Sequence, residues 1–246
     1  MKICIAQTAP KKGDVQANIE THVKLIDLAL TYHVDAIFFP ELSLTSYEPQ
    51  LAKKLATHQN DYRLDIFQQI SDGNKIIIGL GMPTKVESFV RISMIIFEPN
   101  RPRQTYSKQQ LHSDEFSYIE NGDGQLIIET SDLKIAPAIC YESLQSQHSE
   151  NAFALGANVY LASVAKPENG FKKALAHYPA IAKQFAMPVL MSNSVGFCDN
   201  FLSIGKSSIW NKDGELVAQL DDRSEGILVF DTETEKIIEK SMKMNP

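Results

Sequence analysis

Short runs made up mostly of apolar residues recur along this chain, and each stops at a proline, a glycine or a polar turn. They cover residues 34–39, 75–80, 89–97, 133–139 and 158–164. A half-solvated strand alternates apolar and polar side chains, whereas a mainly apolar run is typical of a sheet that is covered on both faces. Residues 18–32 and 171–185 have the spacing of amphipathic helices instead. We therefore expect strands and helices to alternate in a layered α/β fold.

Further elements follow from turn residues and periodicity. Besides the runs above, we expect strands at 2–8, 126–129, 189–192 and 226–230, a hairpin of 204–210 with 215–220, a broken helix at 50–71, a helix at 141–156 and a polar tail. Pro137 lies inside a predicted strand, where it removes a ladder donor, so an edge or bulged position is expected there. Because no linker, low-complexity segment or short repeat interrupts the pattern, we expect one domain over residues 1–246.

Charge and composition exclude several classes of protein. The formal net charge is −6 and no basic block is present, so a nucleic-acid partner is not expected. The sequence has no run of 18 apolar residues, so a membrane span is not expected. The first residues have the pattern of a strand and not of a signal peptide, and we therefore expect a cytoplasmic protein. The three cysteines lack metal-ligand spacing, so neither a metal nor another cofactor is expected.

Three residues with complementary chemistry each follow a predicted strand or its exit: Glu41, Lys108 and Cys140. In α/β sheets the carboxyl ends of the strands carry the ligand site, so these residues can converge despite their separation in sequence. A carboxylate can take the thiol proton, the thiolate can attack an electrophilic carbon, and an ammonium can stabilise the resulting oxyanion. Taken singly, Cys140 could equally be a small buried hydrophobe, and Glu41 or Lys108 a solvated surface charge.

Three segments, FFPELSLTSYEP, YSKQQL and LKIAPAICYESL, resemble the glutamate, lysine and cysteine blocks of the nitrilase superfamily of carbon–nitrogen hydrolases, in the same order. The resemblance implies a four-layer αββα sandwich that forms a homodimer or a higher homo-oligomer. It also implies that Glu41 is the general base, Cys140 the nucleophile, and Lys108 with the backbone N–H of Tyr141 the oxyanion site. A second glutamate in the family matches Glu115, with Glu120 as the alternative.

Some positions depart from the pattern of the family. Gln110 replaces the histidine of many relatives, and Ser46 stands where many have glycine, so the loop after Glu41 is expected to turn differently. The segment QSQHSEN after the cysteine block is also unusual. A Cys–His dyad is a weaker alternative to the Glu–Lys–Cys set, because its candidate histidines have polar or surface-like contexts. These candidates are His112, His148 and His177.

The resemblance indicates hydrolysis of a small linear amide or an N-carbamoyl compound through a cysteine thioester, with release of ammonia or an amine. Pocket walls are expected from Tyr47, Tyr141, Ser163, Val164, Ala165 and Asn193. No arginine stands out as a ligand for an acidic substrate, and Cys198 lies in a loop that could border the pocket. The alternatives are a true nitrile hydrolase and a catalytically idle member of the family that acts as a binding or scaffold protein.

Overall fold

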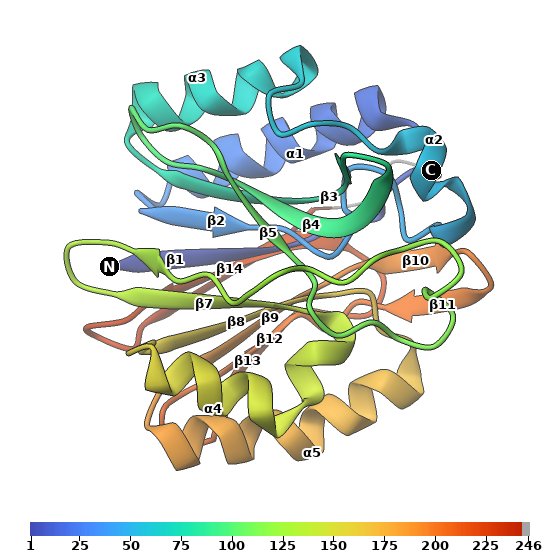
Figure 1. Ribbon diagram of the computed structural model, residues 1–246. Coiled ribbons are helices and arrows are strands. Elements are labelled where there is room, and N and C mark those ends of the chain that lie inside the picture. Colours follow the sequence, from blue (N-terminus) through green and yellow to red (C-terminus); the bar gives the residue numbers. More distant parts are fainter. Residues whose placement is uncertain (243–246) are drawn as a thin grey trace.

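The computed structural model describes residues 1–242 and has four layers, two β-sheets face to face with helices outside each (Figure 1). Helices α1 (Val15–Leu30) and α3 (Asp65–Asn74) cover one sheet, and α4 (Ser146–Ala154) and α5 (Glu168–Phe185) cover the other. This is the αββα arrangement that the resemblance implied, and it confirms the layered α/β fold expected from the sequence pattern. None of the helices in residues 1–242 has the length and apolarity needed to cross a bilayer.

The first sheet has the strand order β15-β14-β1-β2-β3-β4-β5. Its strands are β1 (Lys2–Gln7), β2 (Ala36–Phe38), β3 (Ile77–Val86), β4 (Phe89–Phe97), β5 (Gln104–Ser107), β14 (Glu225–Asp231) and β15 (Ile237–Met242). β1, β2 and β3 are parallel, whereas each of the other pairings is antiparallel. Two antiparallel steps separate β3 from β5, so β5 also runs in the direction of β2.

The second sheet has the order β13-β12-β9-β8-β7-β6. Its strands are β6 (Ile128–Glu129), β7 (Lys134–Ile139), β8 (Val159–Val164), β9 (Val189–Asn193), β12 (Ser208–Trp210) and β13 (Leu216–Gln219). β7, β8 and β9 are parallel. A separate hairpin joins β10 (Val195–Cys198) to β11 (Phe201–Ile204). The short elements are η1 (Pro49–Leu51), α2 (Ala52–Leu55), η2 (Tyr62–Leu64) and η3 (Cys140–Leu144).

Alternation along the strands explains the layers. On β1, Ile3 and Ile5 point into the core between the sheets, while Cys4 and Ala6 point into the core under α1. On β7, Ile135 and Ile139 face the inter-sheet core in the same way, and the alternate side chains pack under α4 and α5. Successive residues of a strand face opposite sides of the sheet. A strand with apolar residues at both odd and even positions is therefore buried on both of its faces.

Two serines connect the sheets directly. Ser163 on β8 donates a 2.8 Å hydrogen bond from its hydroxyl to the carbonyl of Phe39, just beyond β2. Ser192 on β9 donates to the carbonyl of Ala6 at 2.5 Å. Both serines are buried, so their hydroxyl groups must find partners inside the protein, and these bonds fix the position of one sheet against the other.

The structure differs from several expectations. The segment 141–156 forms two pieces, η3 and α4, separated by an extended Gln145. The polar tail contains β15, which pairs with β14, and β10 and β11 lie where a loop was expected. Ser46 adopts φ +65° despite its side chain, so it takes the left-handed conformation that was thought to require glycine. At Pro137, β7 is paired with β8 on one side but no longer with β6 on the other. The position is therefore a local edge of the sheet, as expected for proline.

Candidate active site

The carboxyl ends of three parallel-running strands bring the three sequence candidates to one end of the sheets. Glu41 lies three residues after β2, Lys108 directly follows β5, and Cys140 directly follows β7. Two of them come from the first sheet and Cys140 from the second. The site therefore lies between the sheets, at the end where ligands bind in open α/β folds.

Lys108 is held between two carboxylates. Its ammonium donates a 2.8 Å hydrogen bond to Oε1 of Glu41 and a 2.6 Å hydrogen bond to Oε1 of Glu115. All three side chains are fully buried. Glu115 also accepts from the backbone N–H of His112 at 2.8 Å, and the Tyr47 hydroxyl lies 2.9 Å from its Oε1. Glu120, the alternative second glutamate, is exposed and takes no part in this cluster.

The electrostatics of the cluster keep Lys108 charged. Burial lowers the pKa of its ammonium, but Glu41 and Glu115 outweigh that effect and raise the pKa overall. For Glu41, burial is the largest influence and raises its pKa, and neighbouring Glu115 also raises it, while Lys108 lowers it. A carboxylate with a raised pKa is a stronger base than a solvated one, so Glu41 is suited to accept a proton.

Cys140 adopts an unusual backbone conformation where β7 passes into η3. Its φ is +50°, a left-handed value that is uncommon outside glycine and typical of a side chain presented at a sharp turn. The thiol lies 3.9 Å from the carbonyl oxygen of Ala165. Burial and then the neighbouring charge of Glu41 raise the pKa of Cys140 to about 11, so the resting thiol is neutral and requires a base to become a nucleophile.

Tyr141 is the second residue of η3. The first residues of a helical turn leave backbone N–H groups free, and these groups can stabilise an oxyanion. The ring of Tyr141 is partly exposed and packs against the His112 ring at 5.6 Å. The backbone N–H of Tyr141 can thus donate to an oxyanion, while its ring forms part of the wall of the cavity at Cys140.

A cavity of about 850 Å³ opens at Cys140. Of the residues predicted from the sequence to form its walls, Tyr47, Tyr141 and Ala165 line it. The other three do not. Ser163 is turned into the space between the sheets by its bond to Phe39, and Val164 is buried in the core under α4 and α5. Asn193 is also fully buried, and its side chain accepts from the N–H of Lys166 and donates to the carbonyl of Gly205.

Glu142 is a structural residue that the sequence analysis missed. Its carboxylate is fully buried and accepts from the backbone N–H groups of Ile139 at 2.7 Å and Gln109 at 2.6 Å, and from the Tyr106 hydroxyl at 2.6 Å. One side chain thereby joins the turn of Cys140 to the loop of Lys108. Burial raises the pKa of Glu142 to about 7, although these donors act in the opposite sense.

Lys166 is the second residue that the sequence analysis missed. It follows β8 after Ala165, borders the cavity and is 3% exposed. Its ammonium lies 3.4 Å from the carbonyl oxygen of Cys140. The rule that found Glu41 and Cys140, a polar residue just past an apolar strand, also applies to Lys166 and could have identified it.

The remaining candidates fall outside the Glu–Lys–Cys cluster. His148 is buried, which corrects the expectation of a surface context, and it bonds to the hydroxyls of Tyr106 and Tyr160 at 2.9 and 2.8 Å, away from the thiol of Cys140. His112 is exposed and pairs with Asp114. Cys198 is buried and does not line the cavity.

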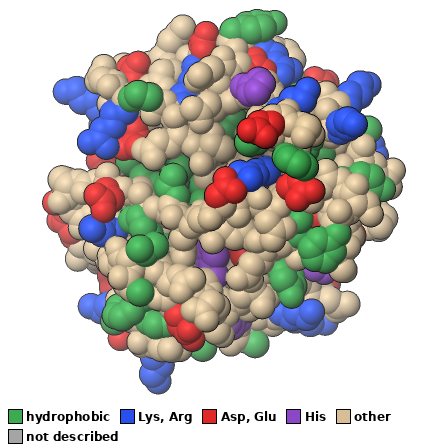
Figure 2. All heavy atoms as spheres, in the orientation of Figure 1, with side chains coloured by type: hydrophobic (Ala, Val, Ile, Leu, Met, Phe, Trp, Pro, Cys, Tyr) green, Lys and Arg blue, Asp and Glu red, His purple; other side chains and the backbone are tan. Residues whose placement is uncertain are grey.

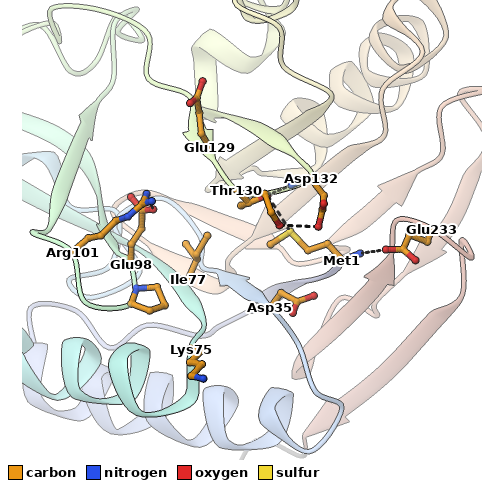
Figure 3. Close-up of a pocket in the computed structure, with 12 residues that line it drawn as sticks. Met1, Asp35, Lys75, Ile77, Glu98, Arg101, Glu129, Thr130, Asp132 and Glu233 are labelled. Atoms are coloured by element: carbon orange, nitrogen blue, oxygen red, sulfur yellow. Dashed lines mark hydrogen bonds and ion pairs between the residues drawn. The ribbon is translucent and has the colours of Figure 1, made fainter.

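A second cavity of about 520 Å³ lies at the opposite end of the strands (Figure 3). It is lined by charges of both signs, and two pairs of them are bonded to each other, Arg101 with Glu98 and the amino terminus of Met1 with Glu233. It contains no thiol and no member of the cluster. The chemistry of the candidate site is therefore confined to the cavity at Cys140.

Charge distribution on the visible face and the search for metal ligands give no second candidate site. On the face shown in Figure 2, acidic and basic side chains are interspersed without a large patch of one sign. Among residues 1–242, no group of three or more histidine, cysteine, aspartate or glutamate side chains has an arrangement that could hold a metal ion.

Comparison with known proteins agrees with the class that the three sequence blocks resemble. The sequence profile of carbon–nitrogen hydrolases matches residues 2–240. The chain belongs to the carbon–nitrogen hydrolase family. Glutamine-dependent NAD(+) synthetase of Acinetobacter baylyi is 27% identical over 231 residues, which are 89% of this chain and 41% of that protein. The chain likewise spans about two fifths of two further synthetases, those of Thermotoga maritima and Aquifex aeolicus.

Solved structures agree in fold. An amidase from Nesterenkonia sp. AN1, in a variant whose active-site cysteine carries a Michael adduct of acrylamide, has a TM-score of 0.87 at 19% identity, covering 96% of this chain and 94% of that chain. A cysteine-to-alanine variant of the same amidase, in complex with butyramide, has a TM-score of 0.85 at 19% identity, covering 93% and 89%. At this identity the likeness concerns the fold alone.

Proposed function

We propose that this protein hydrolyses the carbon–nitrogen bond of a small linear amide or N-carbamoyl compound through a thioester on Cys140. The observation that carries the proposal is the buried Glu41–Lys108–Glu115 cluster beside a thiol at a strained turn, open to a cavity. A general base, a fixed cation and a nucleophile are the parts that acyl transfer requires.

In the first half-reaction, Glu41 takes the thiol proton while the Cys140 sulfur bonds to the carbonyl carbon. The carbonyl oxygen becomes an oxyanion, which the Lys108 ammonium and the Tyr141 N–H stabilise. Glu41 then returns the proton to the nitrogen, the carbon–nitrogen bond breaks, and ammonia or an amine leaves. Glu115 holds Lys108 in place and keeps it charged. No donor has to reorganise as charge develops, which is the main benefit of such a site.

In the second half-reaction, water adds to the thioester. Glu41 takes a proton from the water, the carbon–sulfur bond breaks, and the thiol of Cys140 is restored with release of the carboxylic acid. In each half-reaction Glu41 first accepts a proton and then returns it, so one carboxylate can act as both base and acid.

The amidase that shares the fold is described with butyramide bound and with acrylamide added to its cysteine, which supports small amides as the substrate class. The synthetase relatives use glutamine, so the side-chain amide of glutamine is a second candidate. The expectations of a homo-oligomer, a cytoplasmic location and a single domain stay predictions.

The test is mass spectrometry of wild-type and Glu41→Gln protein incubated with simple aliphatic amides, ω-amides, ureido acids, glutamine and short nitriles. We expect an acyl adduct on Cys140 and ammonia release that is lost in Cys140→Ala. Turnover of nitriles but not amides would make the protein a nitrile hydrolase. A Cys140 that forms no adduct and is no more reactive to iodoacetamide than Cys198 would indicate an idle binding protein and refute the proposal.

A further inference from the structure

The carbonyl oxygen of Cys140 is held by two side chains at the turn that presents the thiol. The Ser143 hydroxyl donates a 2.5 Å hydrogen bond to it, and the Lys166 ammonium lies 3.4 Å from the same oxygen. Ser143 is fully buried and Lys166 is 3% exposed, so bulk water competes little for either contact. Both contacts therefore act on the main chain of a residue whose φ of +50° is uncommon outside glycine.

Ser143 has a further partner, the hydroxyl of Tyr178 on α5, at 2.6 Å. A serine hydroxyl carries a single hydrogen, and Ser143 uses it for the carbonyl of Cys140. Tyr178 is therefore the donor in the second bond, and the two bonds run in one direction, from Tyr178 through Ser143 to Cys140. Hydrogen bonds in such a chain polarise and strengthen one another where water is absent.

Tyr178 is placed to act through Ser143. Its side chain is fully buried, and its ring packs edge-on against the Trp210 ring with the centroids 5.3 Å apart. Among residues 1–242 its hydroxyl has no hydrogen-bond partner besides Ser143. Neither Ser143 nor Tyr178 lines the cavity at Cys140, so any effect of these two residues on a reaction there must pass through the protein itself.

The carbonyl of Cys140 and the N–H of Tyr141 belong to one peptide group. This group is trans and planar, so its C=O and N–H bonds point in opposite directions and turn together. A donor that fixes the carbonyl therefore also fixes the N–H, and by polarising the amide it makes the N–H a stronger donor. Within residues 1–242 the Tyr141 N–H has no partner outside η3, so it is free to bind an oxyanion.

We propose that the hydroxyls of Tyr178 and Ser143 position and polarise the Cys140–Tyr141 peptide group, and thereby strengthen the Tyr141 N–H as a donor to the oxyanion. This inference rests on the proposed acyl transfer, in which that N–H and Lys108 stabilise the same oxygen. Ser143 and Tyr178 are thus positioning residues that are fixed before charge develops. The rival account is that both hydroxyls only stabilise the fold around Cys140.

Two reagents that react with the same thiol separate these accounts. Para-nitrophenyl acetate transfers its acetyl group to the Cys140 sulfur through a tetrahedral oxyanion; Glu41 takes the thiol proton and para-nitrophenolate leaves. Methyl methanethiosulfonate contains no carbonyl group; its methylthio group forms a disulfide with the sulfur, and methanesulfinate leaves. Both reactions require an accessible, activated thiol, but only acetyl transfer requires an oxyanion donor.

The rate of acetyl transfer is the release of para-nitrophenolate, corrected for that of Cys140→Ala. Mass spectrometry of the peptide that contains Cys140 gives the rate of disulfide formation. In Ser143→Ala we expect acetyl transfer to slow about 10-fold, less than the roughly 100- to 1000-fold cost of removing a whole oxyanion donor. Disulfide formation should change less than about 2-fold.

Tyr178→Phe is the second variant, since it keeps the ring against Trp210 and removes only the hydroxyl. It should slow acetyl transfer about 3-fold and leave disulfide formation unchanged. Ser146→Ala is the matched control, because Ser146 is an exposed serine three residues after Ser143, and it should change neither rate. Equal slowing of both reactions in Ser143→Ala and Tyr178→Phe, or unchanged acetyl transfer in both, would overturn the inference.

The double variant Ser143→Ala/Tyr178→Phe tests whether Tyr178 acts through Ser143. If it does, the double variant should transfer acetyl groups no more slowly than Ser143→Ala alone. Losses that multiply would contradict the chain from Tyr178 to Cys140.

The same assays separate this inference from the proposed function. If the wild type releases para-nitrophenolate no faster than Cys140→Ala and hydrolyses no amide, the proposed function fails. If amides are hydrolysed while the Ser143 and Tyr178 variants slow both reagents equally, only the positioning role fails.

Discussion

Glu142 accepts a 2.6 Å hydrogen bond from the backbone N–H of Gln109. These residues come from the two loops that carry Cys140, the proposed nucleophile, and Lys108, the proposed catalytic lysine, and the two loops follow strands of different sheets. The bond is charge-assisted and its acceptor Glu142 is fully buried, so it is stronger than an ordinary hydrogen bond. The position of Lys108 relative to Cys140 therefore depends on a side chain that touches neither of their reacting atoms.

Replacing Glu142 with glutamine should misplace Lys108. The glutamine amide would present donor hydrogens to backbone N–H groups that now have an acceptor, leaving at least one of them unsatisfied. We expect kcat to fall about 100-fold and the free energy of unfolding to fall by about 1–3 kcal/mol. Steady-state ammonia release and urea unfolding measure the two effects. Glu150→Gln, an exposed site on α4, is the control, and equal kcat values for the two variants would disprove the positioning role.

Glu142 should also make stability depend on pH. Its pKa is about 7 in the folded protein against an ordinary 4.5, so the folded state binds the proton more tightly than the unfolded state. The contribution of this residue to the free energy of unfolding should therefore fall as pH rises from 4.5 through 7, by about 3 kcal/mol at most.

Urea unfolding of wild type and Glu142→Gln at several pH values isolates this contribution, because the other titrating groups cancel in the difference. The stability advantage of the wild type should be larger at pH 5 than at pH 8. A difference that grows toward alkaline pH would contradict the raised pKa of Glu142.

The rate should follow a bell-shaped curve in pH. On the acid side kcat/KM should be lost as Glu41 is protonated, at a pH above the ordinary 4.5, because burial raises its pKa. On the alkaline side kcat/KM should fall near pH 11, where Cys140 loses its proton to solvent. Glu41 then has no thiol proton to pass to the leaving nitrogen. The kcat/KM for a good amide substrate, followed by ammonia release, gives both limits, and an acid limit below pH 4.5 would count against Glu41 as the base.

Glu115 and Glu120 should respond differently to the same change. Glu115→Gln removes one of the two charges that hold Lys108, so we expect kcat to fall about 10- to 100-fold. Glu120→Gln alters an exposed carboxylate and should change kcat less than about 2-fold. Parallel assays of the two purified variants provide the comparison, and similar losses in both would reject Glu115 as the second glutamate.

Ser46 should be a site where glycine stabilises the protein. Its φ of +65° strains a residue with a side chain, and its buried hydroxyl has no hydrogen-bond partner among the described residues. Ser46→Gly should raise the free energy of unfolding by about 1 kcal/mol. Ser46→Ala removes only the hydroxyl, so it separates the two causes. A melting temperature that is lower in Ser46→Gly than in wild type would refute this account.

Much of the fold could be predicted from local pattern. The bounds of β4 agree with the sequence, and those of β1, β8 and α5 differ only at their ends, because their apolar periodicity is strong. β15 was missed because, as an edge strand, it carries charged side chains. The break at Gln145 was missed since nothing in the local sequence marks it.

Some residues of the candidate site could likewise be predicted from local sequence, whereas others depend on the tertiary structure. The convergence of Glu41, Lys108 and Cys140 could be predicted because each follows a strand, whereas the roles assigned to them come from the resemblance to the family and stay predictions. Glu142 could not, since its role depends on loops that are brought together only by the stacking of two sheets. Lys166 also follows an apolar strand, so the same rule could have marked it, and its burial then distinguishes it from a surface lysine.

The hydroxyl groups of Ser163 and Ser192 have a consequence for how activity is gained and lost. They join strands that lie more than a hundred residues apart in the chain, and the proposed triad draws Glu41 and Lys108 from one side of that junction and Cys140 from the other. A partly folded intermediate that retained either half alone would have correct secondary structure and no activity. Recovery of turnover during refolding should therefore report the last docking event and lag behind the recovery of circular dichroism.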